Sequence, residues 1–459
     1  MQQPFAWKDG QLHVDSIPLA EIAGAAGTPT YVYSATGIRA AFERLRAAFA
    51  ELSPELHYAV KACPNLSICR LLHELGAGMD VVSGGEMERA WLAGTPMKDV
   101  VFAGVGKTEA EIRAALDGRH HLLGPAVAGT IDPAERGPVG LFNVESESEL
   151  ATFARLAEEL GVTARVCLRV NPNVDAETHE YTTTGKNENK FGIEKTEIAS
   201  LFDQFAGHPA IELVGLHVHI GSPVPRVEPY VDAVGVLLGL IDDLARRGHP
   251  VTLLNLGGGW PTAYRDGEVP PVESYARAVV PLLRDRARAG LQILLEPGRS
   301  IVAGNGLLLT RVVRVKRGRA RTFVICDAGM HTLIRPALYR AFHFIWPVAW
   351  SGAAPDRVER PDVDALEPCD VVGPICETGD FLARDRPLPA LEEGDLLAVF
   401  SAGAYGMSMA SNYNDHGRPA EVLVEGDRSR LVNARQSLAS HFAGEMAPRE
   451  LALGERARV

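Results

Sequence analysis

The sequence predicts an α/β fold in which a (β/α)8 TIM barrel, residues 28–308, is followed by a mainly β domain, residues 309–459. Three observations support this prediction. The chain has 459 residues, whereas a single hydrophobic core usually stops growing at roughly 250–300. Eight short apolar runs alternate with amphipathic stretches of helical period. After about Leu309, that alternation gives way to short strand-like runs separated by Gly, Pro and Asp.

The eight apolar runs are the candidate barrel strands. They are His57–Val60, Met79–Val82, Val100–Ala103, Leu141–Val144, Arg165–Val170, Leu213–Val218, Leu253–Leu256 and Ile293–Glu296. The amphipathic stretches between them are Leu66–Leu75, Gly85–Leu92, Thr108–Leu116, Glu147–Leu160, Glu197–Phe205, Val231–Arg246 and Ser274–Ala289. Strands that alternate with helices indicate a parallel sheet closed into a barrel. An open doubly wound sheet would show the same alternation.

The second domain is predicted from six further strand-like runs. They are Leu309–Val315, Thr322–Cys326, Asp370–Val372, Leu396–Ser401, Ala420–Val424 and Arg430–Asn433. Within residues 1–27, Gln11–Leu19 alternates like a strand, and we expect it to join this domain. Asp356–Pro368 has the composition of a polar surface loop.

Composition and charge exclude several classes of function. The formal net charge of -12 disfavours binding to nucleic acid, because phosphate backbones would be repelled. The first residues lack the pattern of a secretory signal, and no stretch approaches the ~20 apolar residues that cross a bilayer. The six cysteines form no CxxC pair, and no His cluster has zinc spacing. We therefore expect a cytoplasmic protein without a metal site or a membrane span.

Polar residues follow most of the predicted strands, at the edge where a parallel barrel gathers its catalytic groups. They are Lys61 after the first strand, Ser83 after the second, Asn143 and Glu145 at the close of the fourth, Asn171 after the fifth, His219–Ser222 after the sixth, Gly257–Gly259 after the seventh and Glu296–Arg299 at the end of the eighth. Because chance would not align them on one rim, this pattern predicts an active site there.

Lys61 ends the first apolar strand. A lysine in such a place is costly unless it is paired or used, and burial lowers its pKa and leaves a neutral amine nucleophile. The alternative is a lysine whose ammonium extends to solvent. The other rim residues favour the functional interpretation.

The glycine run Gly257–Gly259 could let backbone N–H groups approach an anion such as phosphate, although a plain tight turn is the alternative. No third glycine has the spacing of a dinucleotide fingerprint. Gly106–Thr108 is similar to the end of a Walker A loop, but the glycine that such a loop requires five residues upstream is replaced by Val101.

Glu296 and His219 could serve a flat cofactor ring. A carboxylate beside a pyridine nitrogen keeps that nitrogen protonated and makes the ring an electron sink. His219 could stack on the ring, whereas His217 is predicted to be structural. Arg299 could bind a phosphate or a carboxylate in bidentate fashion. The alternative is a Glu296–Arg299 ion pair that closes the barrel.

Two segments of the second domain also carry reactive groups. Arg335 and Tyr339 are four residues apart, so in a helix they share a face and could hold one carboxylate. Cys376 and Glu377 join a thiol to an acid in a Gly-containing loop. A thiol can protonate a carbanion and a Glu can bind an ammonium. Taken alone, those two residues favour a buried Cys beside a solvated Glu.

Several motifs together resemble one family. YAVKA at 58–62, DVVSGGE at 80–86, HVHIGS at 217–222, EPGR at 296–299 and GAY at 403–405 are similar to the fold-type III pyridoxal-phosphate (PLP) decarboxylases. ENKFGI at 188–193, DAGM at 327–330, RPALY at 335–339, GPICETGDF at 373–381 and residues 402–414 resemble the diaminopimelate decarboxylases among them. The relatives that act on basic amino acids usually have Asp where Glu377 stands. The resemblance spans about Pro29–Val424.

The resemblance implies a reaction and a role for each matching residue. The reaction is the PLP-dependent decarboxylation of meso-2,6-diaminopimelate to L-lysine, the last step of lysine biosynthesis. Lys61 would bind the cofactor covalently, His219 would stack on its ring, Glu296 would face its ring nitrogen and Cys376 would donate the proton. Its phosphate would contact Ser222, Gly257, Gly258, Gly259, Gly298, Arg299 and Tyr405; the substrate would contact Arg299, Arg335, Tyr339, Glu377 and Tyr405. In this family the Cys–Glu loop completes the neighbouring subunit's active site, which implies a homodimer.

The sequence departs from the family pattern in three places. Pro223 follows Ser222 where diaminopimelate decarboxylases commonly have Gln. Trp260 and the two residues after it replace a more usual Leu-Gly-Ile or Phe-Gly, and Gly118–Gly140 resembles an insertion.

Two alternatives stay open at this point. One is a related fold-type III decarboxylase that acts on another amino acid or on an aminoacyl group tethered to a carrier protein. The other is a non-catalytic regulatory homologue. A homologue of that kind should have lost Lys61 or Cys376, and this chain retains both.

Overall fold

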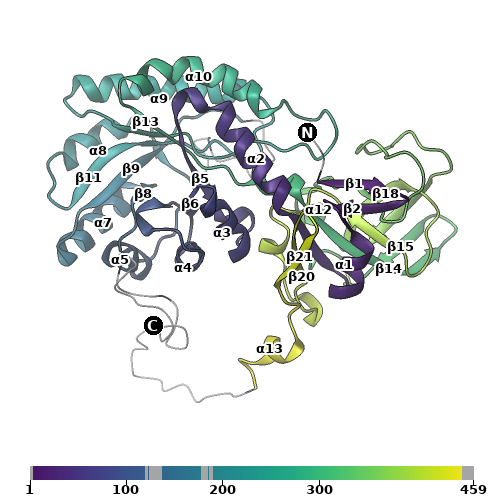
Figure 1. Cartoon of the computed structure of the whole chain (residues 1–459). Helices are drawn as coiled ribbons and strands as arrows, with labels where there is room; N and C mark the ends of the chain where they lie inside the picture. Colours follow the sequence, from purple (N-terminus) through teal and green to yellow (C-terminus); the bar gives the residue numbers. More distant parts are fainter. Residues whose placement is uncertain (1–3, 119–121, 123–136, 177–184, 186–189, 447–459) are drawn as a thin grey trace.

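The computed structural model describes residues 4–118, 122, 137–176, 185 and 190–446. Figure 1 shows two lobes: a barrel ringed by helices, and a lobe made mainly of strands. Most of the predicted insertion at 118–140 lies outside the described residues.

The barrel is a closed ring of eight parallel strands. They are β5 (Glu55–Ala59), β6 (Gly78–Val81), β7 (Val100–Phe102), β8 (Leu141–Val144), β9 (Ala164–Asn171), β11 (Ile211–His217), β12 (Leu253–Asn255) and β13 (Gln292–Leu295). The ring closes because β13 pairs with β5. The short strand β10 (Ile193–Glu194) adds to β9. The eight predicted strands and their closure into a barrel are confirmed, and the open-sheet alternative is wrong.

Helices cover the outside of the barrel (Figure 1). They are α3 (Leu66–Glu74), α4 (Gly84–Leu92), α5 (Glu109–Asp117), α7 (Glu147–Leu160), α8 (Ile198–Phe205), α9 (Glu228–Arg246) and α10 (Val272–Arg288). Each buries one apolar face against the strands, as the helical spacing of its apolar residues predicts.

The barrel interior is a packed layer of small and branched side chains. Six neighbouring strands contribute one residue each: Val101, Leu141, Cys167, Val214, Leu253 and Leu294, all buried. Since this layer fills the space beneath the rim, ligands can enter only from the end where the polar residues lie.

Side-chain caps fix the beginnings of several helices, among them α5 and α7. Ser146 accepts a hydrogen bond from the Glu149 N–H at the start of α7. The Glu149 carboxylate accepts the Glu145 N–H at 2.7 Å. A full capping box occurs at Thr108 and Glu111 of α5.

The second lobe contains a large mixed sheet in the order β18-β17-β15-β14-β4-β20-β21. Its strands are β4 (Thr30–Ser34), β14 (Gly306–Arg317), β15 (Thr322–Cys326), β17 (Glu367–Val372), β18 (Phe381–Leu388), β20 (Ala420–Glu425) and β21 (Arg428–Asn433), and β19 (Leu396–Val399) joins β14 and β16 (Ile345–Pro347). Three short helices accompany them: α11 (Arg299–Val302), α12 (Arg335–Tyr339) and α13 (Leu438–Phe442).

The N-terminal segment lies against this sheet. Strands β1 (Phe5–Lys8), β2 (Gln11–Val14) and β3 (Ile17–Pro18) form a small antiparallel sheet, followed by α1 (Leu19–Ala26). The Leu12 N–H donates to the Val348 carbonyl at 2.8 Å. Helix α2 (Ala35–Ala48) leads from β4 to the barrel. The boundary predicted after residue 308 falls within β14, and the division into residues 28–308 and 309–459 stays a prediction.

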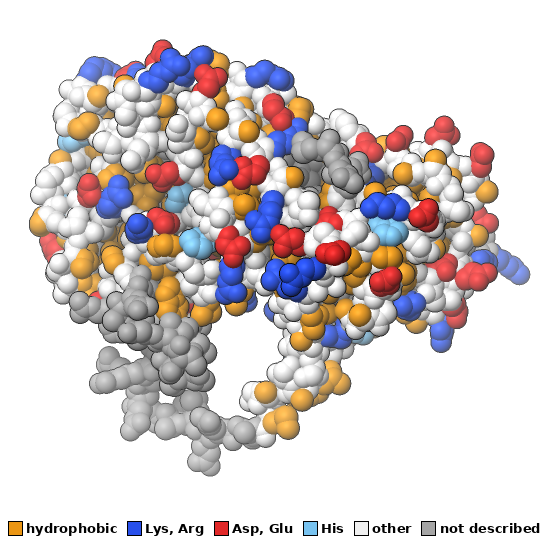
Figure 2. Space-filling view, viewed as in Figure 1, with side chains coloured by type: hydrophobic (Ala, Val, Ile, Leu, Met, Phe, Trp, Pro, Cys, Tyr) orange, Lys and Arg blue, Asp and Glu red, His pale blue; other side chains and the backbone are white. Residues whose placement is uncertain are grey.

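The visible surface is charged and mixed in sign. Figure 2 shows Lys and Arg side chains interspersed with Asp and Glu over both lobes. Among the helices that the structure describes, none combines the length and the apolar composition that a bilayer span requires.

The packing of the barrel floor predicts the effect of truncating it. Leu294→Ala removes a side chain that is 2% exposed, and should lower the free energy of unfolding by about 2–5 kcal/mol. The same truncation at Leu431, which is 61% exposed, should change it by less than about 0.5 kcal/mol. Urea titration of both variants measures the difference. Equal losses would contradict the assignment of Leu294 to a filled barrel interior.

Candidate active site

A cavity of about 400 Å³ opens at the carboxyl ends of the barrel strands, a size suited to a small ligand. Among the predicted site residues, those that line it are Lys61, His219, Ser222, Gly258, Gly259, Glu296, Gly298, Arg299 and Tyr405. These residues lie far apart in sequence, and the barrel brings them together. Gly257, Arg335, Tyr339, Cys376 and Glu377 are not among the cavity-lining residues.

Lys61 follows β5, and one third of its side chain is exposed. Its Nζ donates a short hydrogen bond to a carboxylate oxygen of Asp80, a fully buried residue on β6. Burial alone would lower the pKa of Lys61, but Asp80, Tyr405 and Glu296 raise it by more, so its pKa lies above the usual value. The predicted neutral amine is therefore wrong, because Asp80 compensates the charge of the ammonium.

Glu296 lies at the end of β13 and is held by three side chains. Its Oε1 accepts hydrogen bonds from the side-chain amides of Asn143, at 3.0 Å, and Asn255, at 2.7 Å. Its Oε2 lies 3.3 Å from His217 Nε2. Burial alone would raise the pKa of Glu296, but His217, Lys61 and the Asn255 hydrogen bond hold it well below the usual range. The carboxylate is therefore ionised inside the cavity, and the alternative of an ion pair with Arg299 is wrong.

The two neighbouring histidines differ in their contacts. His217 was predicted to be structural, but it faces Glu296 and lines the cavity. His219 Nδ1 accepts a hydrogen bond from the Gly258 N–H at 3.1 Å. Burial, with help from Arg169 and Lys61, lowers the pKa of His219 well below its usual value. His219 is therefore a neutral imidazole with its proton on Nε2.

The glycine run packs too closely for any side chain. A Cβ on Gly258 would lie 2.3 Å from the Glu296 carbonyl oxygen, and one on Gly259 would lie 2.3 Å from that of Gly221. Two of its amides serve the fold, because the Gly257 N–H donates to Asn255 and the Gly258 N–H to His219. The backbone of this turn therefore shapes the cavity wall, with fewer free N–H groups than the sequence suggested.

Two buried arginines make the opposite end of the site positive. Arg299 donates to the Ser222 hydroxyl at 3.2 Å and to the Tyr264 hydroxyl at 2.8 Å, and its guanidinium lies over the Tyr405 ring. The Arg335 guanidinium lies over the ring of the same Tyr264. Within the described residues, neither guanidinium forms an ion pair with a carboxylate. This end of the site is therefore suited to an anion.

Arg335 and Tyr339 lie on α12, so the condition for their sharing one helical face is met. Arg335 donates to His343 Nε2 at 2.8 Å, and the other ring nitrogen of His343 donates to the Phe400 carbonyl at 2.8 Å. Burial and then Arg335 lower the pKa of His343 to about 3. The neutral imidazole thus orients the guanidinium.

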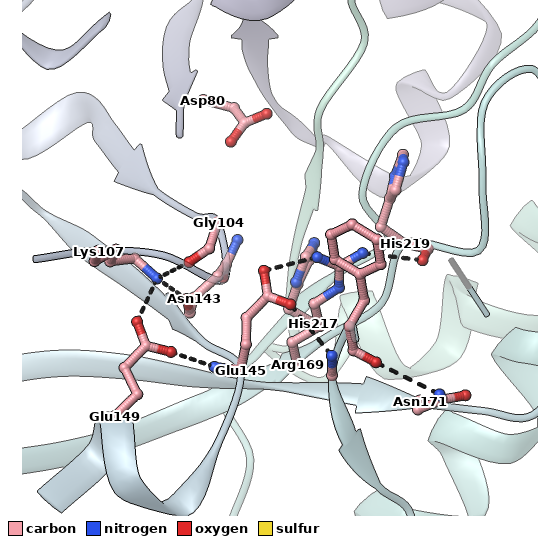
Figure 3. Close-up of polar contacts among 12 residues, drawn as sticks. Asp80, Gly104, Lys107, Asn143, Glu145, Glu149, Arg169, Asn171, His217 and His219 are labelled. Atoms are coloured by element: carbon pink, nitrogen blue, oxygen red, sulfur yellow. Dashed lines mark hydrogen bonds and ion pairs between the residues drawn. The ribbon is translucent and has the colours of Figure 1, made fainter. Parts of the chain in front are cut away.

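A second polar network supports the wall beneath the rim (Figure 3). Lys107 donates to the carbonyls of Gly104 and Asn143 and to the Glu149 carboxylate. Glu145 accepts from Arg169 at 2.7 Å, and Arg169 also donates to the His219 carbonyl. Because Lys107 is bound within the fold, it is not a phosphate-binding lysine.

The loop that carries Cys376 and Glu377 lies away from this cavity. Cys376 is exposed, unlike the other five cysteines, so the alternative of a buried Cys is wrong. Its Sγ lies 3.3 Å from Asn414 Oδ1, and the Glu377 carboxylate accepts a hydrogen bond from the Tyr413 hydroxyl at 2.8 Å. The chain's own fold does not bring the thiol to Lys61.

Comparison with known proteins identifies the family. Residues 35–303 match the family described as pyridoxal-dependent decarboxylase, pyridoxal binding domain. The diaminopimelate decarboxylase of Pseudomonas aeruginosa is 46% identical over 441 residues, which cover 96% of this chain and 98% of that relative. The diaminopimelate decarboxylase of Neisseria meningitidis serogroup A is 45% identical over 95% of this chain and 99% of the relative. The chain belongs to the diaminopimelate decarboxylase family.

Solved structures of diaminopimelate decarboxylases share the whole fold. The enzyme from Helicobacter pylori, complexed with L-lysine, is 36% identical with a TM-score of 0.82, over 93% of this chain and 99% of that one. The enzyme from M. jannaschii, in co-complex with L-lysine, is 34% identical with a TM-score of 0.84, over 98% and 99%. This member of the family is a pyridoxal-dependent carboxy-lyase. The predicted family and the predicted fold are therefore confirmed.

The cavity fits the cofactor that the family name implies. An amine, a buried carboxylate and a neutral imidazole line the cavity, and an arginine without a carboxylate partner among the described residues lies at its far end. Gly258 and Gly259 form part of the cavity wall, where the absence of side chains brings the backbone to the cavity. These groups match the aldehyde, the ring and the phosphate of pyridoxal phosphate.

Several residues that shape this diaminopimelate decarboxylase site were not predicted to act there. Asn255 ends β12, so the rule that selected Lys61 and Glu296 could have found it. Asp80 lies inside β6, where that rule does not apply. Tyr264 follows β12 by nine residues, and His343 lies in an irregular segment. Neither position carries a periodic signal.

The buried neutral His343 predicts a dependence of stability on pH. The unfolded imidazole takes up a proton below about pH 6.5, whereas folded His343 does so only near pH 3. The contribution of neutral His343 to the free energy of unfolding is therefore fully present above about pH 6.5, and it is lost as the pH drops below that value. Between pH 6.5 and 5, this effect should lower the free energy of unfolding of the wild type by about 1.4 kcal/mol per pH unit. His343→Gln should lack this part of the pH dependence, so its free energy of unfolding should fall less steeply. Urea titrations at several pH values measure this, and identical slopes would contradict a neutral His343.

Proposed function

We propose that this enzyme decarboxylates meso-2,6-diaminopimelate to L-lysine with pyridoxal 5'-phosphate, the last step of lysine biosynthesis. One observation carries the proposal. Lys61, the ionised Glu296 and Arg299 line one cavity. Arg299 contacts the Tyr264 hydroxyl, and Arg335 lies over the ring of the same tyrosine. Relatives at 45–46% identity are named diaminopimelate decarboxylase, and the two solved relatives above are complexed with the proposed product.

The cofactor is held by residues from both ends of the cavity. Lys61 would bind its aldehyde, Glu296 would face its ring nitrogen and His219 would stack on its ring. Ser222, Gly257, Gly258, Gly259, Gly298, Arg299 and Tyr405 would hold its phosphate. When bound, the cofactor ring accepts the electrons left behind as carbon dioxide departs. Glu296 favours that chemistry because its carboxylate keeps the ring nitrogen protonated.

The substrate is selected at its distal end. Arg299, Arg335, Tyr339 and Tyr405 bind the distal carboxylate, and Glu377 binds the distal ammonium. An analogue that lacks either group would leave a buried charge of the protein unpaired, which is how a polar site rejects close analogues.

The proton for the product comes from Cys376 of a second subunit, so the enzyme acts as a homodimer. Two observations support this arrangement. Cys376 and Glu377 are exposed and do not line the cavity of their own chain. A second hollow of about 460 Å³ opens on the other side of Lys61, between Glu86, Arg89 and Met409, where a partner's loop can reach the amine.

A substrate panel tests the reaction. Purified enzyme with pyridoxal phosphate should release carbon dioxide from meso-diaminopimelate, and far less from ornithine, arginine, lysine or the other diaminopimelate stereoisomers. Borohydride reduction followed by peptide mass spectrometry should find the cofactor on Lys61. Lys61→Ala should abolish both turnover and the visible absorbance of the bound cofactor. Faster release of carbon dioxide from another amino acid would indicate a different substrate within the same family. A fully active Lys61→Ala variant would refute the proposal.

A mixing experiment tests the shared site. Lys61→Ala and Cys376→Ala should each be inactive as homodimers, whereas a mixed dimer should contain one intact site made of the two wild-type residues. Subunit exchange at equal amounts should restore about a quarter of the wild-type activity. If the two residues acted within one chain, mixing would restore none.

A further inference from the structure

The loop that carries Cys376 and Glu377 is fixed at its base. Asp380 is buried, and its two carboxylate oxygens accept the N–H groups of Met330 and Ile375, each at 2.6 Å. Gly329 and Gly373 meet so closely that a Cβ on Gly373 would lie 2.4 Å from the Gly329 Cα. The loop therefore leaves the sheet in one defined direction. The base also holds the backbone of the tip, because the Asp380 N–H donates to the Glu377 carbonyl at 3.1 Å.

The tip is held by a second segment, residues 411–416. Asn414 Oδ1 accepts from the Cys376 N–H at 3.2 Å and from the thiol at 3.3 Å. The Tyr413 hydroxyl donates to Glu377 Oε2 at 2.8 Å, and that carboxylate raises the pKa of Tyr413. Each of the two reactive side chains thus has its own partner in a neighbouring pair of residues.

The supporting segment is anchored beside the loop base. The Ser411 N–H donates to the His331 carbonyl at 2.9 Å. The His331 and His416 rings lie 4.7 Å apart. His331 directly follows Met330, whose N–H binds Asp380, so loop and support are fixed to the same turn. Asn414 adopts φ 53° and ψ 33°, a left-handed conformation that asparagine tolerates.

We propose that Asn414 and Tyr413 are positioning residues for the partner subunit's active site: Asn414 orients the Cys376 thiol, and Tyr413 orients the Glu377 carboxylate. This inference rests on the proposed roles of Cys376 and Glu377. All four side chains are exposed on the single chain, where water competes for such hydrogen bonds and weakens them. When a second subunit covers the loop, the same bonds are desolvated and become stronger.

The two contacts predict different kinetic effects. The thiol delivers a proton at the reacting carbon, so its misplacement slows the chemical step. Asn414→Gly removes the amide without straining the left-handed backbone, and should lower kcat about tenfold with KM nearly unchanged. The Glu377 carboxylate binds the substrate's distal ammonium, so Tyr413→Phe should raise KM about fivefold with a smaller effect on kcat. Asn414→Asp keeps an acceptor oxygen in place and should recover most of kcat.

Thiol alkylation gives a readout that is independent of turnover. The other five cysteines are buried. In the proposed dimer the Cys376 thiol faces the partner's substrate cavity, so iodoacetamide that enters this cavity reports on Cys376. Asn414→Gly should speed alkylation about threefold because the sulfur is released from the amide, whereas Asn414→Asp should not. Asn173→Gly is a matched control, since Asn173 is also exposed at a positive φ, 55°, and should leave kcat, KM and alkylation unchanged.

Cys376→Ser separates the possible failures. If that variant retained wild-type turnover, the proposed proton donor would be wrong, and the inference would fall with it. If Cys376→Ser were inactive while Asn414→Gly kept the wild-type kcat and alkylation rate, the proposed role of Cys376 as proton donor would be supported. The positioning role of Asn414 would then be refuted. Equal loss of kcat in Asn414→Gly and Asn414→Asp would also refute it, because the acceptor oxygen would then be irrelevant.

Discussion

The active site depends on keeping one carboxylate ionised inside the barrel. Removing a carboxylate from water costs several kcal/mol unless hydrogen bonds and opposite charge compensate it. Glu296 receives that compensation from Asn143, Asn255 and His217, which come from three other strands. These three side chains lie in the carboxyl-terminal halves of strands that are far apart in sequence, and the closed barrel places them around one side chain.

The site is polarised as a consequence. Asp80 and Glu296 make one end negative, and Arg299, with Arg335 behind it, makes the other end positive. Lys61 lies near the negative end and is held as an ammonium by Asp80. A ligand with a cationic ring and an anionic tail can therefore bind in one orientation. Tyr264 contributes to this polarity because it contacts both guanidinium groups. Its hydroxyl accepts a hydrogen bond from Arg299, and its ring face lies under Arg335. Both arginines are buried.

Sequence reasoning found the parts of the site that follow from strand periodicity. Lys61, His219 and Glu296 each end a predicted strand, so their convergence followed from the barrel alone. The charge state of Lys61 did not follow, because it depends on Asp80 in the neighbouring strand. His217 was predicted to have only a structural role, because the alternation of residues along a strand cannot reveal which side chain lies across the barrel. Tyr264, His343 and Asn414 lie in irregular segments, where only tertiary contacts assign a role.

The central claim is that the Glu296 carboxylate keeps the cofactor's ring nitrogen protonated. Nitrogen-15 NMR of the enzyme loaded with pyridoxal phosphate labelled at that nitrogen tests it most directly. The account predicts the chemical shift of a protonated pyridine at neutral pH in the wild type, and that of a neutral pyridine in Glu296→Gln. A neutral shift in the wild type, or the same protonated shift in both proteins, would contradict it.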